Sequence, residues 1–262
     1  RSDESPMTNS KGYVGAERVA AQQYFQRLVA ELKHTVNDKG AHAGPIERHN
    51  HYTAYTWLYL AIATASRGVS HPFENLDLAV NTGSLHLHDK DLESAGQARV
   101  AFLPDELIRH LEYYLDWSYS IAQVMARAAP EANIPFGQMV VESNRVTLQP
   151  LHESTGYPMI GSLFFLDELW HPKPATPASV KEHMGAKHPL PINSQRHLLR
   201  SALLEKGCPE KVIDAFLGHW ERGLEPWASY SVMDPKLYRQ QLLAYLEPIL
   251  DALGFESLQA PR

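Results

Sequence analysis

The sequence contains a single cysteine, Cys208, among its 262 residues. No disulfide can therefore form within the chain, and one unpaired thiol suits a reducing compartment. The sequence also lacks an apolar run of membrane-spanning length and an N-terminal pattern of the secretory-signal kind. These absences predict a protein with no membrane partner and a cytoplasmic location.

An excess of positive charge is missing too. The chain has 24 lysines and arginines against 30 aspartates and glutamates, which gives a formal net charge of −6. Non-specific binding of nucleic acid depends on Lys and Arg that displace phosphate counterions, so this balance argues against it. A basic groove is still compatible with an acidic protein, because net charge averages over all faces.

Apolar residues recur at helical spacing over most of the chain. The stretch 49–66 is apolar nearly all round, which predicts a buried helix. Further helices are predicted over 15–37, 105–129 and 178–186, with two short ones within 193–220. The predicted helix at 235–254 has an apolar face made of Leu237, Leu242, Leu243, Leu246, Ile249 and Leu250.

Residues 84–104 have a different pattern. The runs SLHLHDK and ARVAFLP alternate or are apolar, and the polar stretch DLESAGQ joins them, which predicts a β-hairpin. Residues 130–160 include Pro130, Pro135 and Pro150 and are expected to be irregular. The run GSLFFLDELW fits a short strand or a buried turn of helix, and HPKPATPAS fits a proline-rich loop. The sequence therefore predicts a mainly α-helical (α+β) fold with a small antiparallel sheet.

The segment 193–220 has polar residues at a helix start and a Gly-His at a helix end. Gly207 lies eleven residues after Arg196, and Leu217-Gly218-His219 closes the segment. A competing register that pairs His197 with Arg200 leaves Arg200 only seven residues before Gly207, a full helical turn short. We therefore prefer Arg196.

Three more residues complete an ordered set. Arg67 ends the predicted buried helix in the context Ala-Thr-Ala-Ser-Arg, and Lys90 lies on the predicted hairpin. Tyr230 lies eleven residues beyond His219 and is followed by Ser-Val-Met-Asp-Pro, which opens the last helix. Tyr238 is the fallback tyrosine, although it would sit inside that helix.

This ordered set resembles the catalytic domain of the tyrosine recombinases, the phage-integrase family, over roughly residues 46–250. The resemblance implies one such domain over 15–262, preceded by a disordered tail or linker over 1–14. It also implies strand exchange on double-stranded DNA by a tetramer, assembled through the C-terminal helix, in the bacterial cytoplasm at the nucleoid. The family's N-terminal DNA-clamping domain is expected to be absent from this chain.

The resemblance also implies a role for each residue. Tyr230 would attack a phosphodiester and form a 3′-phosphotyrosyl link that stores the energy of the broken bond. Arg67 and Arg196 would offer planar, permanently charged donors to the phosphorane, with His219 as a further donor. Lys90 would protonate the leaving 5′ oxygen. This chemistry needs no metal and no cofactor.

Some positions depart from the family pattern. Ala65 stands where a glycine is usual, and Ser70 where an acidic residue is usual. Asn193 occupies a place that is most often histidine, and an amide cannot act as a base at neutral pH. His197 and Trp220 are possible auxiliary residues. These departures make a catalytically inactive DNA-binding relative the first alternative function.

A metal-dependent hydrolase is the second alternative. His86 and His88 alternate on a predicted strand, so both imidazoles would face one side and could hold a metal, although no third ligand is evident. The run His49-Asn50-His51 has the letters of a nuclease class but lies at the head of an apolar helix. We interpret that run as the polar start of the helix.

Overall fold

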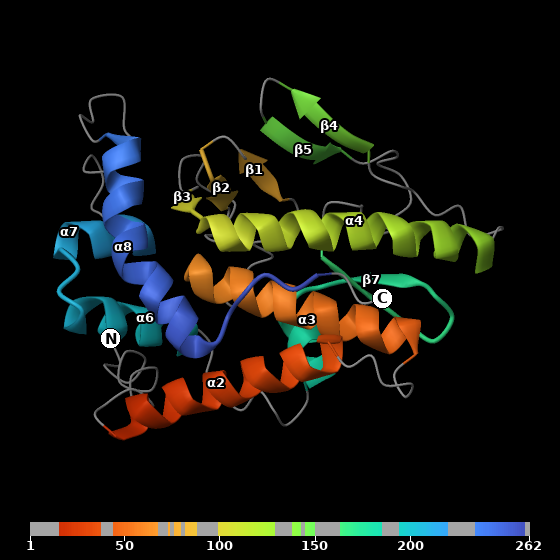
Figure 1. Ribbon diagram of the computed structural model, residues 1–262, viewed down its shortest axis with the longest axis horizontal. Coiled ribbons are helices and arrows are strands. Elements are labelled where there is room, and N and C mark those ends of the chain that lie inside the picture. The colour runs from red at the N-terminus through yellow and green to blue at the C-terminus, as the bar shows by residue number, and fades with distance from the viewer. Residues whose placement is uncertain are drawn as a thin grey trace, which may run out of the picture.

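The computed structural model describes residues 16–37, 44–67, 73, 76–79, 82–87, 99–128, 138–142, 145–149, 163–184, 194–219 and 234–259. This part of the chain is mainly α-helical with two small antiparallel sheets (Figure 1). The expected tail over 1–14 and the residue Ser70 lie outside it. The helices are α2 (Ala16–Asn37), α3 (Pro45–Ala63), α4 (Asp105–Ala128), α5 (Pro177–Met184), α6 (Ser194–Glu205), α7 (Glu210–Leu217) and α8 (Pro235–Leu253).

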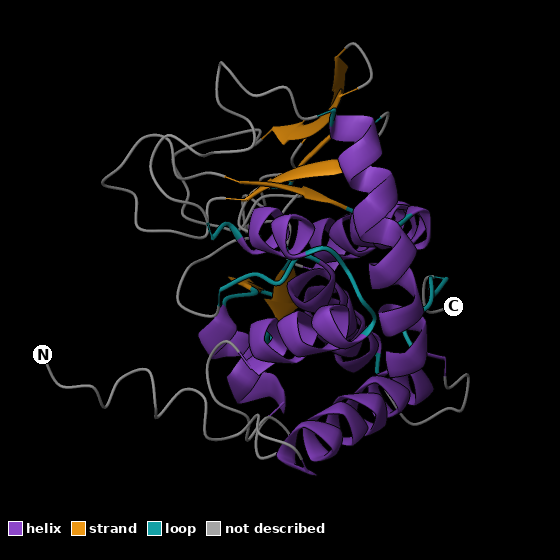
Figure 2. Cartoon of the chain, turned by 90° about the vertical axis from the view of Figure 1, so that its left-hand side faces the viewer, coloured by secondary structure: helices purple, strands orange, loops and turns teal. Residues whose placement is uncertain are grey.

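The larger sheet has five strands in the order β3-β2-β1-β5-β4, and every pair is antiparallel. The predicted hairpin over 84–104 is confirmed, because β2 pairs with β3 and places Leu87 opposite Arg99. Figure 2 shows these strands gathered at one end of the molecule, away from α2. The strands are β1 (Asp77–Ala79), β2 (Ser84–Leu87), β3 (Arg99–Phe102), β4 (Gln138–Glu142) and β5 (Arg145–Gln149).

The expectation of an irregular segment over 130–160 is wrong in part. The strands β4 and β5 form a hairpin there, and β5 pairs with β1. All four prolines of the segment (Pro130, Pro135, Pro150 and Pro158) lie outside these strands, so they do not interrupt the ladder. The proline-rich stretch also contains a strand, β7 (Pro172–Pro174), which pairs with β6 (Phe164–Leu166). A two-stranded sheet has only edge strands, and an edge tolerates the missing N–H of proline.

Helix α3 forms the centre of the core, as its apolar sequence predicts. It lies between α2 and α4 and also contacts α5, α6, α8 and β6 (Figure 1). The helix begins at Pro45, earlier than the predicted residue 49, since proline is well suited to the first turn. Among the described helices, none is long and apolar enough to cross a bilayer.

Helix α8 folds back on its own domain and packs against α2, α3, α6 and α7. Five of the six residues predicted on its apolar face are buried, but Leu237 is 51% exposed, so this part of the prediction is wrong. At about 100° per residue, Leu237 lies about 140° around the helix from Leu242. It therefore points away from the buried face.

The segment after α8 is held by side chains of α3 and α4. The Tyr52 hydroxyl donates to the Leu258 carbonyl (2.7 Å), and the Tyr55 hydroxyl donates to the Glu256 carbonyl (2.7 Å). The Leu258 N–H donates to Nδ1 of His110 on α4 (3.1 Å). Side chains of α3 and α4 thus supply the hydrogen bonds that a lone extended segment needs.

Candidate functional site

Arg196 lies in the first turn of α6 and is buried, with only 7% of its surface exposed. Its Nη1 donates to the Ala65 carbonyl (2.7 Å), and its Nη2 donates to the Leu217 carbonyl (2.7 Å). The same Nη2 lies 3.1 Å from Nε2 of His219. One guanidinium therefore joins the start of α6 to the ends of α3 and α7.

The end of α3 explains why this contact forms. Ala65 has a φ of 49°, in the left-handed region that usually favours glycine, and the Ser66 N–H returns to the Ala61 carbonyl (3.1 Å). Gln195, next to Arg196, donates from its side chain to the Ser66 carbonyl (2.8 Å). The half-buried Arg67 follows directly, so the turn brings it beside the start of α6.

The end of α7 places His219 in the same way. Gly218 has a φ of 68°, and the His219 N–H bonds back to the Asp214 carbonyl (2.8 Å). Glycine adopts this left-handed conformation without the steric cost of a Cβ. The Gly-His pair therefore ends the helix and turns the imidazole toward Arg196.

A second buried arginine, Arg99 at the start of β3, contacts the same helix ends. It is 2% exposed, its Nη1 donates to the Phe216 carbonyl (2.8 Å), and its Nη2 donates to the Ala65 carbonyl (3.2 Å). Arg99 was not among the predicted site residues. The sequence carries no local signal for it, because a single arginine in a hairpin is usually on the solvent side.

The cations of the site act on its imidazoles. Partial burial and then the Arg196 guanidinium lower the pKa of His219, although the residue as a whole is exposed. Arg67 and Arg200 lower the same pKa further, and Asp214 opposes them. Burial, Arg196 and Arg200 also lower the pKa of His197. The acidic chain therefore carries a local concentration of positive charge at these helix ends.

Comparisons with protein-family models, with curated proteins and with solved structures find no match to this chain. What the site can do therefore follows from its own donors. Arginine forks and imidazole N–H groups are the donors that proteins use for phosphate and other oxyanions. The cluster is suited to holding such an anion.

Four predicted site residues lie outside the described part of the chain: Lys90, Asn193, Trp220 and Tyr230. Lys90 belongs to the loop that joins the paired residues Leu87 and Arg99. Asn193 directly precedes α6, Trp220 directly follows His219, and Tyr230 comes four residues before Asp234, the N-cap of α8. The structure thus brings together Arg67, Arg196 and His219, with the half-buried His197 next to Arg196 in α6.

The other polar motifs have different outcomes. The described residues hold no group of three or more potential metal ligands, and neither His88 nor the side chain of His86 is among them. The interpretation of His49-Asn50-His51 as helix-start polarity is wrong for the first two. His49 is fully buried with Nε2 2.9 Å from the Phe164 carbonyl, and the Asn50 amide exchanges two hydrogen bonds with the backbone of Leu166. These residues fasten β6 to α3.

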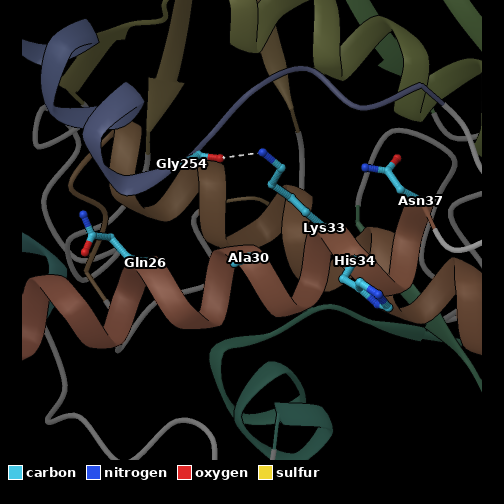
Figure 3. Close-up of a pocket in the computed structure, with 6 residues that line it drawn as sticks. All are labelled: Gln26, Ala30, Lys33, His34, Asn37 and Gly254. Atoms are coloured by element: carbon cyan, nitrogen blue, oxygen red, sulfur yellow. Dashed lines mark hydrogen bonds between the residues drawn. The ribbon is translucent and has the colours of Figure 1, made fainter.

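A pocket of about 480 Å³ lies between α2 and the end of α8 (Figure 3). Gln26, Lys33 and other side chains of α2 line it, opposite the backbone of Gly254. Lys33 Nζ donates to the Gly254 carbonyl (3.1 Å) and pairs with Glu256 (2.7 Å). The polar groups of Lys33 therefore hold the end of α8 in place.

Proposed function

We propose that this chain is the catalytic domain of a tyrosine-type site-specific DNA recombinase and has that family's helical fold. The observation that carries the proposal is the set of hydrogen bonds of Arg196. They reach the Ala65 carbonyl, 131 residues away, and His219, 23 residues away. Ala65 lies at the helix end that precedes Arg67, and His219 lies at the other helix end. These are the segments that the sequence pattern assigns to one phosphate site.

Lys90 and Tyr230, which lie outside the described residues, belong to segments whose ends are described. The loop with Lys90 starts and finishes at the Leu87–Arg99 pair, and Arg99 itself touches Ala65. The segment with Tyr230 starts immediately after His219. The ends of both segments are thus attached to the cluster, which supports a role for both residues in one site.

In the proposed reaction, the Tyr230 oxygen forms a bond to the scissile phosphorus while the bond from phosphorus to the 5′ oxygen breaks. Arg67, Arg196 and His219 hold the charge that develops on the non-bridging oxygens. Lys90 gives a proton to the 5′ oxygen, and religation runs the same steps in reverse. Asn193 cannot accept the phenol proton and His219 serves as a donor to the phosphate, so His197 is the proposed acceptor.

The fallback tyrosine is poorly suited to this reaction. Tyr238 is only 3% exposed and packs against Phe102 with ring centroids 5.6 Å apart. Burial raises the pKa of its phenol well above the usual range. Forming a nucleophilic phenolate there would cost more than in water, which favours Tyr230.

A non-catalytic DNA-binding module is the second candidate, and the burial of Arg196 favours it. A guanidinium that is 7% exposed and bonded to two backbone carbonyls could serve as a structural clamp alone. In that case the positive cluster would bind the DNA backbone without cleaving it. Assembly as a tetramer on DNA belongs to the first candidate and follows from the family resemblance.

A suicide substrate separates the two candidates. Duplexes enriched from a randomised pool by binding to the chain are prepared with nicks near each phosphate, so that a cleaved strand diffuses away and traps the covalent intermediate. We expect an adduct that survives denaturation and maps to Tyr230 by mass spectrometry. Tyr230→Phe should abolish it, and the matched variant Tyr238→Phe should retain it.

The other outcomes are equally informative. Wild-type chain that binds the duplexes and never forms an adduct would establish the binding module instead. An adduct lost in Tyr238→Phe and kept in Tyr230→Phe would overturn the assignment of the nucleophile. Chain that enriches no duplex from the pool would sink both candidates.

A further inference from the structure

Arg99 is an unusual residue to find inside this fold. It is among the largest fully buried side chains, and it sits on a strand where Leu87 is its partner across the ladder. Burying a charge is costly unless hydrogen bonds compensate it. Arg99 is therefore expected to have hydrogen-bond partners that compensate its buried charge.

Its hydrogen bonds go to the carboxyl-terminal ends of two helices. The Ala65 carbonyl lies just past α3, and the Phe216 carbonyl is in the last turn of α7. Helix carboxyl ends carry partial negative charge, which suits a buried cation. Arg196 bonds the same Ala65 carbonyl and the neighbouring Leu217 carbonyl. The two guanidiniums thus bridge the same pair of helix ends side by side.

We propose that Arg99 is a positioning residue, which holds the ends of α3 and α7 at the spacing where Arg67 and His219 flank Arg196. The carboxyl ends that it joins lie two and three residues before Arg67 and His219. Arg99 also closes the loop that contains Lys90, because it pairs with Leu87 at the strand end. One side chain therefore ties together three segments that carry site residues.

The geometric part of this inference stands without any reaction, and its consequence for catalysis rests on the proposed function. If Arg99 keeps Arg196 against His219, removing it should loosen the contact between Nη2 and Nε2, now 3.1 Å. Among the described residues, those whose charges act on the pKa of His219 are Arg196, Asp214, Arg67 and Arg200, and Arg99 is not one of them. A change at His219 would therefore report movement of Arg196 relative to the imidazole.

The first measurement is an NMR titration of the His219 imidazole in folded protein. We expect the pKa of His219 to rise toward its ordinary value in Arg99→Met. It should also rise in Arg99→Lys, which keeps the charge but lacks the planar fork that spans two carbonyls. Arg239→Met is the matched control, because Arg239 bonds the Leu103 carbonyl and Asp105 just beyond the same strand. It should leave the His219 titration unchanged.

The second measurement is the rate of adduct formation on the trapping duplex. A displacement of about 1 Å in a catalytic group can cost about 100-fold in rate. We expect Arg99→Lys to form adduct ~10- to 100-fold more slowly while its affinity for the duplex stays within about 2-fold, since the cations that face the DNA are unchanged. Arg239→Met should react at the wild-type rate.

The two proposals fail in different ways. A His219 titration that is identical in wild type, Arg99→Lys and Arg99→Met overturns the positioning role. If Arg99→Met does not fold, the comparison of Arg99→Lys with Arg239→Met decides alone. A shifted titration in a chain that never forms adduct keeps the positioning role and overturns the recombinase.

Discussion

Acidification should destabilise this fold through two buried histidines before its carboxylates titrate. Nδ1 of His110 accepts the Leu258 N–H (3.1 Å), so its proton lies on Nε2, 2.9 Å from the Thr56 hydroxyl. Nδ1 of His49 accepts the Trp117 indole N–H (3.2 Å), and its Nε2 faces the Phe164 carbonyl. Each imidazole is therefore neutral. A second proton on either ring would occupy Nδ1 and break the hydrogen bond that Nδ1 now accepts.

Burial lowers the pKa of His49 to about 4 and that of His110 to about 3. In the unfolded chain both would titrate near about 6.5. The unfolded state thus binds more protons between these values, so the free energy of unfolding is greatest above about pH 6.5 and falls as the pH drops. The loss is about 1.4 kcal/mol per pH unit for each histidine, or about 2 kcal/mol each by pH 5. The free energy of unfolding of a whole domain is only about 5–15 kcal/mol.

Urea unfolding at several pH values between 7.5 and 5 tests this, because most carboxylates stay ionised over that range. We expect His110→Gln to be less stable at pH 7.5, since glutamine only approximates the imidazole contacts. Its free energy of unfolding should fall less steeply as the pH drops, because unfolding takes up about one proton fewer than in the wild type. A pH slope in the double variant His49→Gln/His110→Gln that equals the wild-type slope would refute the reasoning.

Two further perturbations test the local structure around the site. Gly218→Ala should lower the free energy of unfolding by about 1–2 kcal/mol in a urea titration, because the left-handed conformation crowds a Cβ, and it should also slow adduct formation. Gly207→Ala carries the same strain at φ 78°, with no atom within 4 Å of the added Cβ, and should leave adduct formation intact. Asn50→Ala should lower the free energy of unfolding by about 2 kcal/mol, because it removes both hydrogen bonds to Leu166 from a half-buried site. An unfolding midpoint within error of wild type would contradict the role given to Asn50.

The long helices could be predicted from the sequence because their signal is local. Apolar periodicity placed α2, α4 and α8 within one or two residues of their observed bounds. The hairpin of β2 and β3 was also predictable, since both strands and the loop between them lie in one stretch. These elements carry their own pattern, and packing only selects the face they bury.

The short strands could not be predicted in the same way. A strand of three residues such as Asp77–Ala79 has no periodicity to detect, and its identity comes from its partners β2 and β5. The buried roles of His49 and Asn50 depend likewise on carbonyls 115 and 116 residues away. A polar residue whose partner is that distant looks like surface until the chain is folded.

The candidate site likewise contains residues that could be predicted from the sequence and one that could not. The order and spacing of Arg67, Arg196 and His219 could be read from the chain, because two of them directly follow helix ends with strong local signals. Arg99 could not, since a single arginine in a hairpin is usually on the solvent side. Only the fold reveals that its partners are carbonyls 34 and 117 residues away.

The contact between Arg196 and His219 has a further chemical consequence. A guanidinium can only donate, so Nε2 of His219 accepts and the proton of the neutral imidazole lies on Nδ1. The lowered pKa of His219 favours this neutral form at neutral pH. Protonation would place two donors face to face and separate them, unless an anion lies between them and accepts from both. Binding an oxyanion there must therefore raise the pKa of His219, because linkage requires that a ligand stabilise the protonation state that binds it better. The same residue pair thus becomes a matched pair of donors when a phosphate binds between them.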